Sequence, residues 1–177
     1  QVFRETVIAS PGGSKEFKRN LSGSYIGSWD RRGKYLIASL HKLESQSLGK
    51  TKQGKKFHGW WVVHLRMTGQ FQWHESSIAP CPHTRVSFWD KKGCELRFVD
   101  IRSFGQMWWI PSKSSPTKVI NGLRNLGPEP FSKEFNPLYL KQRIKNKKSS
   151  IKSTLLDQSV VAGIGNIYAD ESLFSAG

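Results

Sequence analysis

Short runs of β-branched and aromatic residues recur along the first two thirds of the chain, and turn residues separate them. These runs predict strands, and they span residues 24–30, 34–43, 59–67, 84–90, 94–100 and 106–110. The runs "TRVSFWD" and "CELRFVD" flank "KKG", a spacing typical of a β-hairpin. Short strands joined by polar loops favour an antiparallel β-sandwich.

The pattern changes to helical spacing after Pro111. A short helix is expected to end at Gly127, and the two prolines of "LGPEPF" indicate a stiff hinge. Ser132 begins an imperfect capping sequence, so a helix is expected to start there. The further helices are predicted in residues 150–161 and 160–174.

These patterns together predict an α+β fold with two parts. The N-terminal antiparallel β-sandwich portion covers residues 1–125, the hinge covers 126–131, and a helical domain covers 132–177. The chain opens without Met and ends on Gly177 directly after a predicted helix, so a fragment of a longer protein is expected.

The large positive charge of the chain indicates the kind of partner that it binds. The formal net charge is +15 and the isoelectric point is about 10.1. Repulsion between so many positive charges destabilises the compact chain unless it binds a polyanion. Nucleic acid is therefore the first candidate partner, and a membrane surface is the second. The lysine-rich segment Lys50–Lys56 is expected to be a solvated loop.

Several other classes are disfavoured. No apolar run reaches the roughly 18 residues of a membrane-spanning helix, and no signal-peptide pattern opens the chain. Cys81 and Cys94 are too few for a four-thiolate zinc site or a disulfide framework, so a reducing intracellular compartment fits. No Ser–His–Asp set, nucleotide P-loop or metal-ligand spacing is present.

Residues at strand ends are the first candidates for nucleic-acid chemistry. Met67 follows a predicted strand beside a turn, and Arg102 and Phe104 share one side of an extended segment. An apolar wedge, a planar cation and an aromatic ring are the groups that open a duplex and contact an unpaired base. For each residue taken alone, an ordinary structural role is the favoured interpretation: a core position for Met67 and Phe104, and a surface charge for Arg102.

Glycines and lysines in the helical part are the second candidates. "GIGN" at Gly163–Asn166 places a glycine turn before a helix, where unpaired backbone N–H groups can hold a phosphate. Lys145–Lys152 is compatible with a charged face or with phosphate tracking. From the residues alone, Lys34, His64 and His83 stay open between structural and binding roles.

Five segments occur in an order that identifies a family. They are "RRGKYL", "VVHLRMTG", "LRFVDIRSFG", "LGPEP" and "VAGIGNIYADESLFSAG". Together they resemble bacterial formamidopyrimidine-DNA glycosylases, which excise oxidised purines such as 8-oxoguanine and act as AP lyases. The resemblance implies a helix–two-turns–helix motif in the helical domain, damaged duplex DNA as the partner, a monomer without membrane association, and a bacterial cytoplasmic, nucleoid-associated enzyme.

The resemblance also implies roles for single residues. Lys34 matches a catalytic lysine beside the lesion, and Met67, Arg102 and Phe104 match the trio that fills the gap left by the flipped base. The remaining matches are DNA contacts, namely His64, His83, Lys147, Asn166 and Tyr168. Pro82 stands where many relatives carry lysine, and Ser103 where many carry a second arginine.

The ends of the chain depart from the family pattern. The family's nucleophilic N-terminal proline and the glutamate after it have no match here, and the chain itself is expected not to catalyse the reaction by the family route. No cofactor is expected within the 177 residues, while a structural zinc is expected in a finger beyond Gly177. Two other functions stay open: a non-catalytic basic nucleic-acid-binding module, and a protein-interaction domain whose charge only keeps it soluble.

Overall fold

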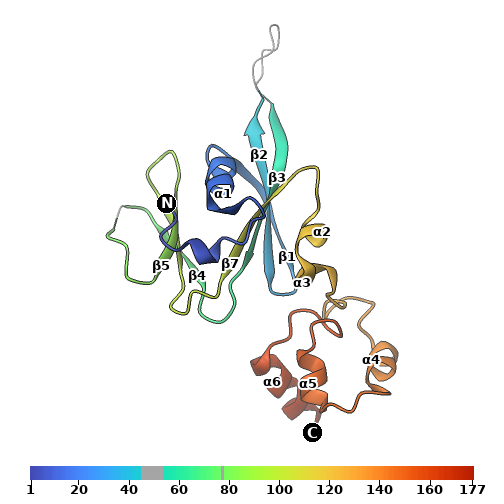
Figure 1. Ribbon diagram of the computed structural model, residues 1–177. Coiled ribbons are helices and arrows are strands. Elements are labelled where there is room, and N and C mark those ends of the chain that lie inside the picture. The colour runs from blue at the N-terminus through green and yellow to red at the C-terminus, as the bar shows by residue number, and fades with distance from the viewer. Residues whose placement is uncertain (45–53, 77) are drawn as a thin grey trace. The chain divides into compact units, whose positions relative to one another are not determined.

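The computed structural model describes residues 1–44, 54–76 and 78–177 (Figure 1). Part of the predicted lysine-rich loop, positions 50–53, lies outside these residues. Lys55 and Lys56 begin a strand instead.

Seven strands in the described residues form two antiparallel sheets. They are β1 (Tyr25–Arg32), β2 (Tyr35–Leu43), β3 (Lys55–His64), β4 (Gln70–His74), β5 (Thr84–Trp89), β6 (Glu95–Val99) and β7 (Gln106–Pro111). One sheet has the order β1-β2-β3-β7 and the other β4-β6-β5. The predicted hairpin is formed by β5 and β6, which pair antiparallel from Thr84↔Val99 to Trp89↔Glu95. The predicted β-sandwich is therefore confirmed.

Three elements of this part were not predicted, and the first along the chain is the short 3₁₀ helix η1 (Glu5–Val7), which buries Val7. α1 (Gly13–Leu21) buries Phe17 while its basic residues stay outside, and β4 pairs with β6. A shared core joins α1 to both sheets; its members include Phe17, Leu40, Trp61, Phe98 and Met107. Burial of these large side chains is the main favourable term for this part of the fold.

The helical part begins later than its capping pattern suggested. The expected start at Ser132 is wrong: α4 (Pro137–Ile144) begins after Asn136, whose Oδ1 accepts a hydrogen bond from the Tyr139 amide at 2.9 Å. Pro137 suits this first helical position because its missing N–H would have no helical partner there. The segment expected to form one short helix contains two, α2 (Pro116–Val119) and α3 (Asn121–Arg124).

Two more helices complete the described elements. α5 (Ile151–Leu156) is capped by Ser150, whose hydroxyl accepts from the Ser153 amide. α6 (Asn166–Ala176) begins directly after the glycine turn.

The chain divides into two compact units. The first contains Gln1–Asp30 and Tyr35–Pro116, and the second contains Arg31–Lys34 and Thr117–Gly177. The short turn between β1 and β2 therefore belongs with the helices. The predicted hinge over residues 126–131 stays a prediction.

Candidate nucleic-acid interface

Three of the predicted site residues form one exposed cluster in the first unit. Arg102 Nη1 donates to the Met67 sulfur at 3.0 Å, and the Arg102 guanidinium carbon lies 4.9 Å from the centroid of the Phe104 ring. Met67 is 73% exposed and Phe104 is 53% exposed. We call Met67, Arg102 and Phe104 the wedge cluster. The cluster presents two apolar side chains and one cation together at the surface.

Left-handed backbone residues stand beside the wedge cluster in both of its loops. Arg66 has φ 57° and Ser103 has φ 56°, and neither is glycine. Non-glycine residues rarely adopt this conformation, and where they do the surrounding structure holds them in it. Each of these two residues directly precedes an exposed member of the wedge cluster, Met67 or Phe104.

Asp100 supplies part of that constraint. Its side chain is completely buried and accepts hydrogen bonds from the Thr68 hydroxyl and, at 2.7 Å, from the Gly105 amide. The same hydroxyl accepts from the Arg102 amide at 3.2 Å. One buried carboxylate thus joins the loop of Met67 to the loop of Arg102 and Phe104. Sequence reasoning missed Asp100, although an acidic residue directly after a strand was a visible signal.

The two predicted histidines differ in exposure. His64 is buried at the end of β3, its Nδ1 accepts from the Arg66 amide at 3.0 Å, and its ring meets Tyr35 edge-on at 4.6 Å. His83 is exposed, and its carbonyl oxygen accepts from the Asp100 amide at 3.0 Å. The backbone of His83 is thereby tied to the loop that carries Arg102.

Lys34 lies in the second unit beside the glycine turn. A Cβ built on Gly165 would lie 3.6 Å from Lys34 Nζ, so the amine stands next to the start of α6. Partial burial lowers the pKa of Lys34 below the usual lysine value. A lysine with a lowered pKa gains and loses its proton closer to neutral pH. This suits acid–base catalysis, in which the pKa of the catalytic group should lie near the working pH.

Glu129 fixes the turn that carries Lys34. Its Oε1 accepts from the Gly33 amide and from Arg32 Nη1, both at 2.7 Å, and Arg31 Nη1 lies 2.8 Å from Oε2. Burial raises the pKa of Glu129, but the hydrogen bonds from Gly33, Arg32 and Arg31 outweigh it, and the pKa is lowered overall. The "LGPEP" segment is thus an anchor for residues 31–34, a role that no local pattern indicated.

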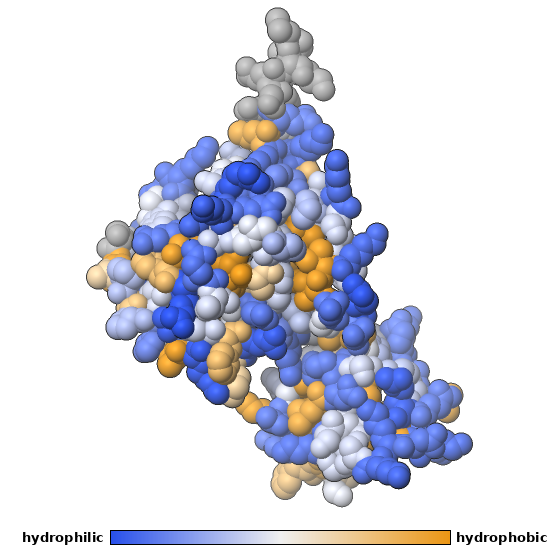
Figure 2. Space-filling model, viewed as in Figure 1, coloured by the Kyte–Doolittle hydropathy of each residue, from blue (hydrophilic) through white to orange (hydrophobic). Residues whose placement is uncertain are grey.

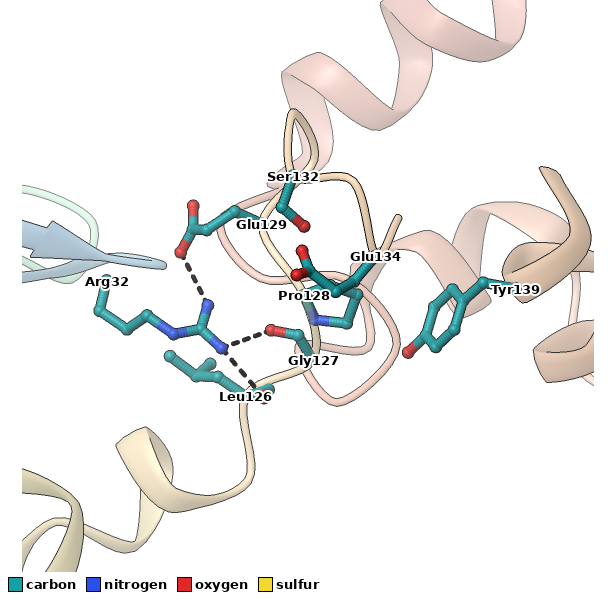
Figure 3. A pocket seen from close by; sticks show the side chains of 8 residues that line it. All are labelled: Arg32, Leu126, Gly127, Pro128, Glu129, Ser132, Glu134 and Tyr139. Carbon is teal, nitrogen blue, oxygen red and sulfur yellow. Dashed lines mark hydrogen bonds and ion pairs between the residues drawn. The ribbon is translucent and has the colours of Figure 1, made fainter. Parts of the chain in front are cut away.

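A pocket of about 470 Å³ lies beside this anchor. Figure 3 shows Arg32 reaching across to Glu129 and to the carbonyl oxygens of Leu126 and Gly127, at 3.2 and 2.6 Å for the carbonyls. With three acceptors on one guanidinium, Arg32 is a structural part of the turn. On the face shown in Figure 2 the surface is mostly hydrophilic, with apolar residues in scattered groups.

The start of α6 offers exposed groups. Gly165 precedes the helix and makes no side-chain capping bond, while Asn166 is exposed and Tyr168 is 70% exposed. Gly163 has φ 88°, which favours glycine at that position. The backbone N–H groups of this first turn can receive an anion.

Lys147 has a partner within the chain. Its Nζ donates to Asp157 Oδ2 at 2.6 Å, and Lys152 Nζ forms a similar pair with Asp170. Lys147 therefore pairs with the residue that caps the end of α5, and Lys152 joins α5 to α6. A DNA contact by Lys147 stays a prediction.

The Lys147–Asp157 pair makes stability depend on pH. Hydrogen bonds from Lys147 and Ser159 lower the pKa of Asp157 from 3.8 to about 2. A lowered carboxyl pKa stabilises the folded state above pH 4, and this contribution is lost as the pH falls from about 4 to about 2. We expect Asp157→Asn to flatten the pH dependence of the second unit's unfolding in that range. Asp170→Asn, which removes the more exposed pair, is the control, and an unchanged profile in Asp157→Asn would contradict the assignment.

Comparison with known families accounts for both units. The family model of the formamidopyrimidine-DNA glycosylase N-terminal domain matches residues 1–107, and that of the formamidopyrimidine-DNA glycosylase H2TH domain matches residues 126–177. The chain belongs to the formamidopyrimidine-DNA glycosylase family. The family resemblance drawn from the five segments is confirmed, as is the helix–two-turns–helix domain.

Individual relatives agree with this family. The formamidopyrimidine-DNA glycosylase of Prochlorococcus marinus (strain MIT 9313) is 61% identical over 176 residues, which cover 99% of this chain and 60% of the relative. The protein of the same name from Parasynechococcus marenigrum (strain WH8102) is 54% identical over 177 residues. The chain thus spans about 60% of the length of these relatives.

Solved structures agree as well. The Lactococcus lactis Fpg bound to a FAPY-dG containing DNA has a TM-score of 0.79 and 26% identity, and the match covers 98% of this chain and 58% of that one. The same enzyme bound non-covalently to an AP site containing DNA also has a TM-score of 0.79. Within the described part of this chain, no helix could cross a membrane and no group of three His, Cys, Asp or Glu residues could hold a metal ion.

Proposed function

We propose that the chain is part of a bifunctional DNA glycosylase and AP lyase that excises oxidised purines, 8-oxoguanine and formamidopyrimidines, from duplex DNA. The single observation that carries this proposal is the wedge cluster, in which Arg102 contacts both Met67 and Phe104 and all three side chains are exposed. Relatives crystallised with FAPY-dG and AP-site DNA support the choice of substrate. The enzyme would act as a monomer on damaged DNA in the bacterial nucleoid, and a structural zinc belongs to the whole protein in this proposal.

The wedge cluster would separate the bases at a lesion. Met67 enters the space left by the extruded nucleotide, and Phe104 stacks on the neighbouring base. The Arg102 guanidinium offers paired donors to the exposed edge of the unpaired base, as a planar fork does best. Unstacking a step costs a few kcal/mol, which a damaged pair lowers.

The second unit would hold the backbone of the flipped nucleotide. The amide groups at the start of α6, with Asn166 and Tyr168, would receive flanking phosphates. Lys34 beside Gly165 would then exchange a proton near the sugar, helped by its lowered pKa. His64, His83 and Lys147 would add contacts to the backbone.

Arg102→Ala tests the proposal. The pairing edge of cytosine offers two adjacent acceptors, N3 and O2, to a guanidinium, whereas that of adenine offers one. In binding to a duplex with an abasic-site analogue, we therefore expect the preference for cytosine over adenine opposite the site to fall roughly tenfold in the variant, the effect of one bidentate base contact. General duplex affinity should fall much less and keep a steep salt dependence, because phosphates supply it. Arg19→Ala, an exposed arginine of α1, is the control.

The outcomes separate the two leading functions. Equal losses on damaged and undamaged duplexes would make Arg102 a phosphate contact and would favour the non-catalytic binding module. A flat response of wild-type binding between low and physiological salt would overturn nucleic-acid binding altogether.

A further inference from the structure

Arg85, at the start of β5, bridges the two segments that carry His83 and Arg102. Its Nε donates to the Asp100 carbonyl oxygen at 2.7 Å, and Nη2 donates to the Ile101 carbonyl oxygen at 3.2 Å. Nη1 donates to the Pro82 carbonyl oxygen at 3.1 Å. One side chain therefore joins the backbone just before His83 to the backbone just before Arg102.

The guanidinium also contacts the His83 ring. Nη2 lies 3.4 Å from His83 Nδ1. Arginine can only donate, so in this contact Nδ1 is the acceptor and the ring proton is on Nε2. Arg85 thus favours the tautomer in which the exposed ring has a donor left for an outside acceptor.

These contacts use most of the donors that Arg85 has. A guanidinium carries five N–H groups, and the carbonyl and ring contacts engage Nε, Nη1 and Nη2. A side chain so occupied is poorly placed to bind a phosphate, and its half-buried position agrees with a structural use. Arg85 would therefore affect DNA binding by fixing the segments of His83 and Arg102, and not by contacting the DNA itself.

We infer that Arg85 is a positioning residue that locks the His83 segment to the wedge cluster and thereby sets discrimination of the base opposite the lesion. The inference rests on the proposed function. Asp100 joins the Met67 loop to the Arg102 loop through its side chain, and Arg85 joins the His83 segment to the same loop through carbonyl groups. Together they fix three loops as one surface before DNA arrives, which lowers the ordering cost of binding.

The first measurement concerns the free chain. In Arg85→Ala, amide hydrogen exchange in residues 100–105 and 81–83 should rise by roughly fivefold to tenfold, the effect of losing about one net hydrogen bond from the closed state. Exchange in β7 should stay unchanged. Arg124→Ala is the matched control, since Arg124 also donates to two carbonyl oxygens, of Thr117 and Lys118, in the other unit.

The second measurement concerns DNA. On a duplex with an abasic-site analogue, the preference of Arg85→Ala for cytosine over adenine opposite the site should be roughly fivefold to tenfold lower than that of the wild type. The dependence of its DNA affinity on salt concentration should be unchanged. Arg85→Lys keeps the charge but cannot present the planar fork, so it should recover little of the preference. Arg124→Ala should keep it.

Each other result overturns the inference in a specific way. Unchanged exchange in Arg85→Ala would show that Arg85 does not hold the loops, and an unchanged base preference would show that holding them does not set discrimination. A shallower salt slope would make it a phosphate contact, and full recovery in Arg85→Lys would make charge the cause. If the wild-type chain showed no preference for the abasic duplex, the proposed function would fail, while the exchange data would still decide whether Arg85 holds the loops.

Discussion

Asp100→Ala is expected to lower the free energy of unfolding of the first unit by about 3 kcal/mol, because it leaves the half-buried Thr68 hydroxyl and the buried Gly105 amide without their acceptor. The left-handed residue Ser103 would lose the constraint that holds it, and the wedge cluster would lose its fixed backbone. Urea unfolding followed by tryptophan fluorescence measures the effect, since all seven tryptophans of the chain lie in the first unit.

Asp90→Ala is the matched control for this change. Asp90 Oδ1 also accepts two backbone bonds, from the amides of Lys92 and Cys94, but in an exposed turn. Water can replace those bonds, so a loss of no more than about 1 kcal/mol is expected. Equal losses in the two variants would show that burial of Asp100 is not what matters.

Glu129→Ala is expected to be the most damaging change in the second unit. It removes the acceptor of the Gly33 amide and leaves Arg31 and Arg32 without their anion, at a cost of about 2 kcal/mol for these partly exposed groups. The amine of Lys34 would lose its fixed place beside Gly165. Amide exchange of α4 to α6 measures the loss, and Glu134→Ala, which removes an exposed carboxylate at the same pocket, should change little.

The same interaction gives a pH signature. Because the folded-state pKa of Glu129 is lowered, its contribution is fully present above the ordinary carboxyl pKa and disappears as the pH falls through the lowered value. The difference between wild type and Glu129→Ala should therefore shrink in acid. A difference that stays constant down to acidic pH would contradict an ionic role for Glu129.

Local patterns were enough for most strands and for the hairpin of β5 and β6. They failed for α1, a helix of nine residues in which only Phe17 and Leu21, four positions apart, mark an apolar face. They also failed for β4, whose residues merge into a polar loop. The start of α4 was misplaced because Ser132 and Glu134 imitate a cap, whereas the residue pair that satisfies the helix is Asn136 with Pro137.

The residues of the candidate site also fall into two groups, those that the sequence predicted and those that it did not. Exposed residues of the wedge cluster were predicted because their chemistry and the family segments point to them. Asp100, Glu129 and Arg85 were not, because each acts through partners that only the folded chain brings together. Glu129, for example, meets Gly33 across 96 positions. Lys147 shows the reverse case, since its partner Asp157 gives it a structural use that its charge alone did not indicate.

The separation of Gly33 from Glu129 also bears on how the chain is made. The turn Arg31–Lys34 leaves the ribosome first, and at about 5 to 20 residues per second the carboxylate that anchors it follows roughly 5 to 20 s later. During that interval two arginines remain without their anion, and the first unit can already close around its core. The second unit is therefore not built from one continuous stretch of chain: its turn Arg31–Lys34 is made early and gains its full set of contacts only after Glu129 has been made.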